Sequence, residues 1–221
     1  MKIEKIIIHE DYCVGNHKDG HDIALVKLKE KVDVSIHTPA CLPPKDADYS
    51  GKLASVYGWG VTKDPQFQLT EEGCRPIAND MSQVLMEATL PIMTTSACKK
   101  ISGKIQECID GVVTETNVSF FVNVTDDMVC GIQTGQGDCY GDSGGPFTVE
   151  EGGQHTLVGV NSWGAVDSCG VVGIIALIVN CVKYIYTLQE GLPSVYSSVS
   201  AQRDWIDTNI QNNGGAKFCN I

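Results

Sequence analysis

The sequence has little positive charge, no full-length membrane span and no metal-binding spacing. It contains 16 Lys and Arg residues against 27 Asp and Glu residues, a formal net charge of −11, which argues against nucleic acid or an anionic membrane as a partner. No C-x-x-C or Cys/His ligand spacing occurs, so we expect no metal and no cofactor. No linker, repeat or low-complexity tract divides the 221 residues, whose length suits one large domain.

The residues that are present favour β-structure. Glycine is frequent, with 23 residues, and stretches with helical periodicity are few. Short runs rich in Val, Ile and Thr alternate with turn residues, which is typical of antiparallel strands. Examples are residues 55–57, 88–92 and 157–160. This pattern predicts an antiparallel barrel architecture.

The segment Gly141-Asp142-Ser143-Gly144-Gly145-Pro146 is the most informative motif in the chain. Gly141 has no side chain to prevent its backbone N–H from turning inward, and Ser143 offers a second N–H beside its own hydroxyl. Two such donors that converge on a tetrahedral oxyanion are the largest single contribution to acyl-transfer catalysis. We therefore predict Ser143 as a nucleophile, with an oxyanion hole formed by Gly141 and Ser143. A glycine-rich turn without chemistry is the alternative.

At these residues the chain resembles the chymotrypsin/trypsin family of serine endopeptidases. Further motifs follow in the order of the family: Asp22-Ile23-Ala24-Leu25, Pro39-Ala40-Cys41-Leu42-Pro43, Gly58-Trp59-Gly60, Met128-Val129-Cys130 and Ser162-Trp163-Gly164. The resemblance runs from Lys5 to Ile210. It implies an all-β fold of two antiparallel six-stranded barrels, the first of them incomplete, with a C-terminal helix. It also implies hydrolysis of polypeptide substrates, with Asp22 as the triad aspartate on the strand that this motif forms.

The resemblance leaves the triad without its histidine, which takes the serine proton and returns it to the leaving amine. In the family this histidine lies in an A-H-C segment well upstream of the aspartate strand, whereas Met1 here starts only a few residues before the expected strand Ile6-Ile7-Ile8-His9. His9 is expected in a surface loop. His21 adjoins Asp22, and on a strand their side chains would point to opposite faces. We expect a sequence that lacks the start of the first barrel and is inactive as printed.

Asp142 resembles the acid that pairs with the ammonium group of a newly cleaved N-terminus. Without that partner a buried carboxylate is unfavourable by several kcal/mol in order of magnitude, so a zymogen-like arrangement is expected. The resemblance implies a specificity pocket lined by Gly137, Asp138, Ser162, Trp163, Gly164 and Ser194.

Trypsin-like members carry Asp at the base of this pocket, where this chain has Gly137, followed by Asp138. Ser194 replaces a glycine on the opposite wall, which should shorten the pocket. Since a partly desolvated charge needs a partner, these changes predict a weakened preference for Arg or Lys. If Asp138 points to solvent, the pocket instead takes medium apolar side chains.

The ten cysteines indicate an oxidising compartment. The resemblance implies the disulfides Cys98–Cys130 and Cys139–Cys169. It also relates Cys41 to the half-cystine that holds a propeptide or light chain, with a partner upstream of Met1. The sequence does not predict the pairing of the other cysteines, which are Cys13, Cys74, Cys108, Cys181 and Cys219.

Residues 99–127 form a segment that is expanded relative to the family, and we expect a surface loop. Two glycosylation sequons lie in it, beginning at Asn117 and Asn123. Residues 2–5 are charged and the apolar run 6–8 is short, so no signal peptide begins at Met1. The cysteines and the sequons together predict a secreted protein.

Residues 171–189 contain an apolar run that ends at Val179, short of the ~20 residues of a membrane helix. Deleting this segment restores the spacing of the family between Cys169 and Tyr196. A retained intron read in frame and a genuine insertion remain open, and a membrane anchor is a third alternative.

The expected domain spans residues 1–212, with a tail at 213–221. It closes with a helix over 200–211, capped by Ser200, with Trp205 and Ile206 among its core-facing residues. Two functions remain: a serine endopeptidase, and a non-catalytic protease homologue that binds partners. The retention of Asp22, Asp142 and Ser143 favours the enzyme.

Overall fold

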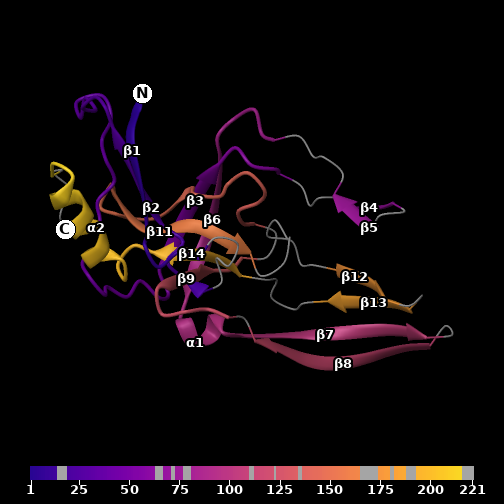
Figure 1. Ribbon diagram of the computed structural model, residues 1–221. Coiled ribbons are helices and arrows are strands. Elements are labelled where there is room, and N and C mark those ends of the chain that lie inside the picture. Colours follow the sequence, from indigo (N-terminus) through magenta and orange to yellow (C-terminus); the bar gives the residue numbers. More distant parts are fainter. Residues whose placement is uncertain are drawn as a thin grey trace.

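The computed structural model describes residues 1–13, 19–62, 67–70, 73–76, 81–109, 112–121, 123–133, 136–164, 174–179, 182–187 and 193–215. Strands dominate the described residues, and the ribbon places the longer helix at the side of the molecule opposite the hairpins β7–β8 and β12–β13 (Figure 1). The elements are β1 (Ile3–Ile8), β2 (Ala24–Leu28), β3 (Leu53–Gly58), β4 (Phe67–Thr70), β5 (Gly73–Pro76), β6 (Met86–Met93), α1 (Thr95–Cys98), β7 (Lys100–Ile109), β8 (Val112–Phe121), β9 (Met128–Gly131), β10 (Pro146–Glu151), β11 (Gln154–Gly164), β12 (Ile174–Val179), β13 (Val182–Thr187), β14 (Ser194–Ser198) and α2 (Arg203–Asn212).

Six strands close into a barrel in the order β10-β11-β14-β9-β6-β3, which confirms the predicted barrel architecture and the three predicted strand segments. Closure leaves these strands without a free edge. Alternate side chains fill the interior, because successive residues of a strand point to opposite faces. Val56, Leu90, Phe147 and Tyr196 are among the buried residues, and the rings of Phe147 and Tyr196 stack with centroids 4.0 Å apart.

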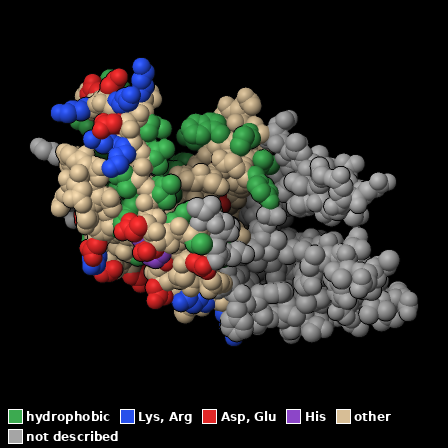
Figure 2. Space-filling model, viewed as in Figure 1, with side chains coloured by type: hydrophobic (Ala, Val, Ile, Leu, Met, Phe, Trp, Pro, Cys, Tyr) green, Lys and Arg blue, Asp and Glu red, His purple; other side chains and the backbone are tan. Residues whose placement is uncertain are grey.

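Strands β1 and β2 form a separate antiparallel ribbon, and the described residues contain no second closed barrel. Ile6 pairs with Val26 across the ribbon, and both side chains are more than half exposed, as is that of Ile8. On the other face Leu25 packs against the cluster of Val199 and the α2 helix. Hydrophobic side chains therefore gather along β1 and β2 on the visible surface (Figure 2).

The expanded segment 99–127 is a hairpin rather than a loop, so that prediction was wrong. Strands β7 and β8 pair over their full length, from Lys100 opposite Phe121 to Ile109 opposite Val112. The dipeptide Asp110-Gly111 between them is the sequence signal for a tight hairpin turn. These two strands extend away from the barrel (Figure 1).

The segment 171–189 contributes a second hairpin to the same sheet. Strand β12 pairs with β13, and β13 pairs with β7, from Tyr184 opposite Glu107 to Thr187 opposite Lys104. The sheet order is β12-β13-β7-β8. Residues 99–127 and 171–189 are the two segments that the sequence analysis identified as additions to the family pattern. They are therefore hydrogen-bonded to each other, through β7 and β13.

The C-terminal helix begins later than predicted, and Ser200 does not cap it. Helix α2 spans Arg203–Asn212, with Gln202 at its N-cap position and no capping bond from that side chain. The hydroxyl of Ser198 instead accepts the backbone N–H of Ala201 at 3.3 Å. The predicted core-facing side is confirmed, because Ile206 is buried and Trp205 packs with it.

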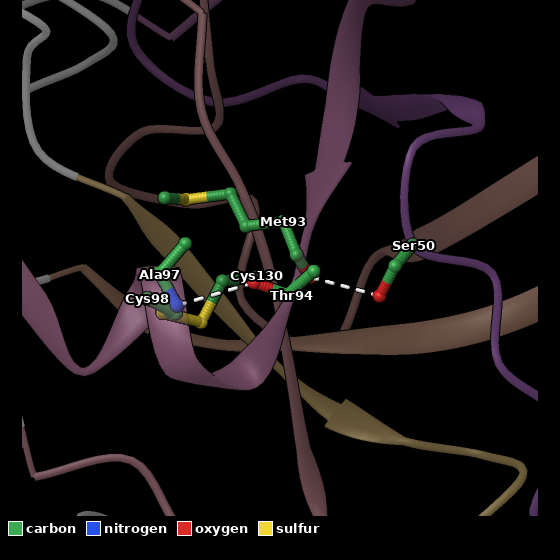
Figure 3. The surroundings of a disulfide bond; sticks show 6 residues. All are labelled: Ser50, Met93, Thr94, Ala97, Cys98 and Cys130. Carbon is green, nitrogen blue, oxygen red and sulfur yellow. Dashed lines mark hydrogen bonds between the residues drawn. A yellow bond between two sulfur atoms is a disulfide. The ribbon is translucent and has the colours of Figure 1, made fainter.

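The predicted disulfide Cys98–Cys130 is confirmed and ties α1 to β9. Thr94 starts α1 by accepting the N–H of Ala97 at 3.2 Å, and the hydroxyl of Ser50 donates to the Met93 carbonyl at 3.4 Å (Figure 3). This short helix is thereby anchored to the barrel at the base of the β7–β8 hairpin.

Two further predicted half-cystines, Cys41 and Cys139, are also disulfide-bonded. The expected link of Cys41 to a propeptide or light chain stays a prediction. Cys169, the expected partner of Cys139, lies outside the described residues. Cys13 is free and exposed. The side chains of the other cysteines lie outside the description as well: Cys74, Cys108, Cys181 and Cys219.

Candidate active site

Ser143 lies on a glycine-rich turn that is fixed against the barrel just before β10. The N–H of Gly144 donates to the Asn161 carbonyl at 2.8 Å, and the N–H of Asn161 donates back to Gly145 at 2.9 Å. Gly141 and Gly144 have φ values of +96° and +78°, a region that strongly favours glycine. The Ser143 side chain is exposed at the tip of this turn. The motif thus presents a hydroxyl to solvent from a rigid backbone.

The Asp142 carboxylate accepts hydrogen bonds, whereas the sequence analysis expected it to be buried without a partner. Its two oxygens accept the backbone N–H groups of Gly60 at 2.7 Å and Cys139 at 3.0 Å. A Cβ atom on Gly58 or Gly60 would lie within 2.6 Å of the Asp142 carboxyl group. The carboxyl group fits here because these two glycines have no side chains. The backbone donors replace part of the solvation that burial removes.

The Asp142 carboxylate lines a cavity of about 160 Å³. The walls come from β3, the start of β6 and the segment before the nucleophile turn. They include Gly58, Gly60, Glu87, Gly137, Asp138 and Asp142. The structure therefore brings the predicted activation acid together with two of the predicted pocket residues, around one acidic cavity.

Asp22 lies two residues before β2 rather than within a strand, so its predicted position on a strand was wrong. The Ser162 hydroxyl, on β11, donates to Asp22 Oδ2 at 2.6 Å. The hydroxyl of Ser197 donates to the Asp22 backbone carbonyl, also at 2.6 Å. Two strands of the closed barrel thus hold the proposed triad carboxylate in place.

His21 has a φ of +57° and precedes β2, so the alternation expected for His21 and Asp22 on a strand does not apply. Its ring stacks on His9 with centroids 4.5 Å apart, and His9 stacks on Trp205 at 4.8 Å. His9 is buried, so its predicted place in a surface loop was wrong. This stack joins the segment before Asp22 to helix α2.

Asp127 supports the same segment, and no motif in the sequence singled it out. It accepts the backbone N–H of His21 at 2.6 Å and the side-chain amide of Gln202 at 3.0 Å. Burial acts to raise the pKa of Asp127, but hydrogen bonds from Thr125 and His21, with the nearby His21 ring, bring that pKa below its usual value. The ionised carboxylate therefore holds the backbone next to Asp22.

Asp138 accepts a hydrogen bond from the buried Tyr196 hydroxyl at 2.8 Å. Burial raises the pKa of Tyr196 well above its usual value, and the Asp138 carboxylate raises it further, so the phenol stays a donor. Asp138 is only partly exposed. The carboxylate is therefore held beside the barrel core and does not extend freely into solvent.

The remaining predicted pocket residues lie on adjacent strands. Trp163 pairs with Val195 and Gly164 pairs with Ser194, so the ends of β11 and β14 lie side by side. Ser194 and Trp163 are buried. The cavity that contains Gly137 and Asp138 is lined mainly from β3 and β6, and these β11 and β14 residues do not line it.

The histidines in the described part of the chain contact residues other than Ser143 and Asp22. His9 and His21 belong to the stack described above, the backbone of His37 bonds to Asp33, and His155 lies 4.0 Å from Glu150. His17 lies outside the described residues.

Among the described residues, no group of three or more His, Cys, Asp or Glu could hold a metal ion, and no helix is long and apolar enough to cross a membrane.

A family model for trypsin matches residues 1–186 of this chain. The mouse (Mus musculus) tryptase is 30% identical over 213 residues, which cover 93% of this chain and 61% of that protein. Trypsin 5G1 from Aedes aegypti is 31% identical, covering 93% of this chain and 58% of its own length. Phenoloxidase-activating factor 1 from Holotrichia diomphalia is 29% identical, covering 96% and 46%. The chain thus spans about half the length of the curated relatives it matches.

Proposed function

Because the chain belongs to the trypsin family, we propose that it is the protease domain of a serine endopeptidase. The observation that carries this proposal is the pair of fixed groups on the barrel. Ser143 stands exposed on a turn that is bonded to β11, and Asp22 receives the hydroxyl of Ser162 on that same strand. One strand therefore positions both the nucleophile and the carboxylate that a triad requires.

In the proposed mechanism Ser143 Oγ attacks the carbonyl carbon of the substrate peptide bond. A histidine that the printed sequence does not supply takes the hydroxyl proton, and Asp22 accepts the other N–H of that imidazole. The backbone N–H groups of Gly141 and Ser143 stabilise the oxyanion. The imidazolium then protonates the leaving amine, and water hydrolyses the acyl-enzyme by the same steps.

Asp142 is proposed to complete the site by pairing with the ammonium group of a freed N-terminus. Its carboxylate already faces a cavity of about 160 Å³, and Glu87 and Asp138 add negative charge to the walls. A cation that enters this cavity would gain a partner in a partly desolvated place. The pairing would fix the adjacent backbone of Gly141 and Ser143.

The proposed endopeptidase acts on polypeptides in a secretory or extracellular compartment, with glycans at Asn117 and Asn123. Asn123 is exposed at the base of β8, which suits a glycan acceptor, and the disulfides suit an oxidising environment. The proposed domain spans residues 1–212, with residues 171–189 as an insertion that supplies β12 and β13.

Labelling with a fluorophosphonate probe tests the proposed function. The full-length protein in its activated form should be labelled rapidly and stoichiometrically at Ser143, because the probe reports an activated serine. A polypeptide of the printed 221 residues should remain unlabelled, since the described histidines make contacts elsewhere. If the activated full-length protein is not labelled, the non-catalytic homologue is the correct interpretation.

Asp138 is proposed as the residue that gives the pocket a weakened preference for Arg or Lys. Because Tyr196 already occupies one of its oxygens, only part of the carboxylate can serve a cationic side chain. Replacing Asp138 by Asn should lower kcat/KM for Arg and Lys substrates by about tenfold and leave apolar substrates nearly unchanged. A peptide library varied at the residue before the cleaved bond measures this. An unchanged Arg and Lys share in Asp138→Asn would rule out Asp138 as the specificity residue.

A further inference from the structure

The barrel carries a second cavity, of about 250 Å³, which shares no lining residue with the Asp142 cavity. Strand β6 connects the two places, because Met86 at its start lines the Asp142 cavity and Met93 at its end lines the second one. At about 3.3 Å per residue, the two ends of this strand are roughly 23 Å apart. The second cavity, which we call the distal groove, is therefore separate from the residues proposed for catalysis.

Apolar residues form much of the lining of the distal groove: Tyr49, Ile92, Met93, Met128, Val129 and Val158. Apolar surface that a ligand covers here leaves water, and the gain grows with the area covered. The volume is smaller than the roughly 300–1,000 Å³ of pockets that hold whole small-molecule ligands. The groove therefore suits single side chains of a bound peptide.

Hydrogen bonds between remote segments hold the distal groove in shape. The Ser50 hydroxyl donates to the Met93 carbonyl at 3.4 Å, which joins the segment before β3 to the end of β6 (Figure 3). The N–H of Asp46 donates to the Ser200 carbonyl at 3.1 Å, which joins the same segment to the residues before α2. A preformed groove lowers the entropic cost of binding to it.

Carboxylates stand on the rim of the distal groove, at the exposed residues Asp46, Asp48 and Asp126. Asp126 pairs with Lys99 at 3.2 Å, whereas the salt bridges within the described part of the chain include neither Asp46 nor Asp48. Hydrogen bonds from the side chain and the backbone of Ser50 hold the pKa of Asp48 below its usual value. Asp48 is therefore an ionised group without a counter-ion.

The lysines on either side of residues 46–48 are paired with other acids. Lys45 pairs with Asp204, and Lys52 pairs with Glu151 at 2.7 Å. The formal net charge of −11 adds a long-range attraction for cations. Charge complementarity therefore favours a ligand that brings its own positive charge to the rim while it covers the apolar lining.

We propose that the distal groove binds a partner polypeptide in which a Lys or Arg side chain lies two residues from a large apolar side chain. Residues two apart in an extended peptide point to the same face. The apolar side chain enters the groove, and the cation meets Asp46 and Asp48 on the rim. This binding does not use Ser143, so it goes beyond the proposed endopeptidase function.

The test measures the fluorescence anisotropy of a labelled peptide of sequence Gly-Arg-Ser-Leu-Gly. The full-length protein carries Ser143→Ala, so that the peptide is not cleaved. Binding should be saturable, with one peptide per protein molecule. Replacing the Arg of the peptide by Gln, or its Leu by Ser, should weaken binding about tenfold in each case.

Variants of the rim locate the site on the protein. Asp48→Asn should weaken binding of the Arg peptide about fivefold and leave that of the Gln peptide unchanged, because only the Arg peptide loses an ion pair. Asp48→Glu should keep the affinity for the Arg peptide. Asp33→Asn is the matched control, because Asp33 accepts the N–H of Ser35 at 2.9 Å just as Asp48 accepts that of Ser50 at 2.8 Å.

Three results would overturn the inference. The first is the absence of saturable binding, and the second is an equal affinity of Asp48→Asn and the control for the Arg peptide, which would place the bound peptide elsewhere on the protein. The third is a dimer, seen by sedimentation, that excludes the peptide, since a second copy of the chain would then occupy the groove. None of these results depends on peptide-bond hydrolysis, so they leave the proposed endopeptidase function untouched.

Discussion

Replacement of Asp22 by Asn is expected to lower kcat about 10⁴-fold with little change in KM. The Ser162 hydroxyl donates to Asp22 Oδ2 at 2.6 Å, and the single oxygen of Asn can still accept that bond. The amide NH₂ group would then face the catalytic histidine. Since that group cannot accept an imidazole N–H, the histidine would be held in the wrong tautomer.

Steady-state kinetics of the activated full-length protein measure this effect, and thermal unfolding checks that the fold is kept. Asp33→Asn is the matched control, because the Asp33 carboxylate bonds only to Ser35 within its own exposed turn in the described part of the chain. A loss in Asp22→Asn no greater than that of the control would show that Asp22 is not the triad carboxylate.

Replacement of Gly58 by Ala is expected to displace the Asp142 carboxylate, because the new Cβ atom would lie 1.8 Å from its Oδ1 atom. The loss of charge-assisted bonds from Gly60 and Cys139 should cost about 2–4 kcal/mol of unfolding free energy. Moving Asp142 also moves the backbone on both sides of it. We therefore expect a fall in kcat of about 10²- to 10³-fold, the size of a lost oxyanion donor.

Gly51→Ala separates this clash from the general cost of replacing a glycine. Gly51 has φ +83° and no atom within 4 Å of the position of a new Cβ, so only backbone strain of about 1 kcal/mol is expected there. Denaturant unfolding and kcat should be measured for both variants. Equal effects in both would mean that the packing of Asp142 against Gly58 does not matter.

The nucleophile turn, the strands of the barrel and one disulfide were predictable from the sequence. The turn at Ser143 requires glycines at its positive-φ positions, and short runs rich in Val, Ile and Thr between turn residues marked strands of the barrel. Cys98–Cys130 followed from the resemblance and is present. Such features depend on local chemistry, which the sequence displays directly.

Features that depend on distant neighbours were not predictable in the same way. Whether Asp22 lies in or before a strand depends on hydrogen bonds from Ser162 and Ser197, which are remote in sequence. The bond that Asp142 accepts from the N–H of Gly60 joins residues 82 apart in sequence, and no motif predicted it. Ser200 carries a suitable capping hydroxyl, yet it is Ser198 that bonds the N–H of Ala201, and the helix starts later.

The hairpin β7–β8 lies between two cysteines that are bonded to each other, 32 residues apart in sequence. The ends of β7 and β8 that lie far from the closed strands project away from the barrel, where a processing enzyme can reach the chain more readily (Figure 1). A single cut there would leave two polypeptides joined through Cys98 and Cys130. The nicked molecule would keep its mass under oxidising conditions and separate into two chains only when reduced.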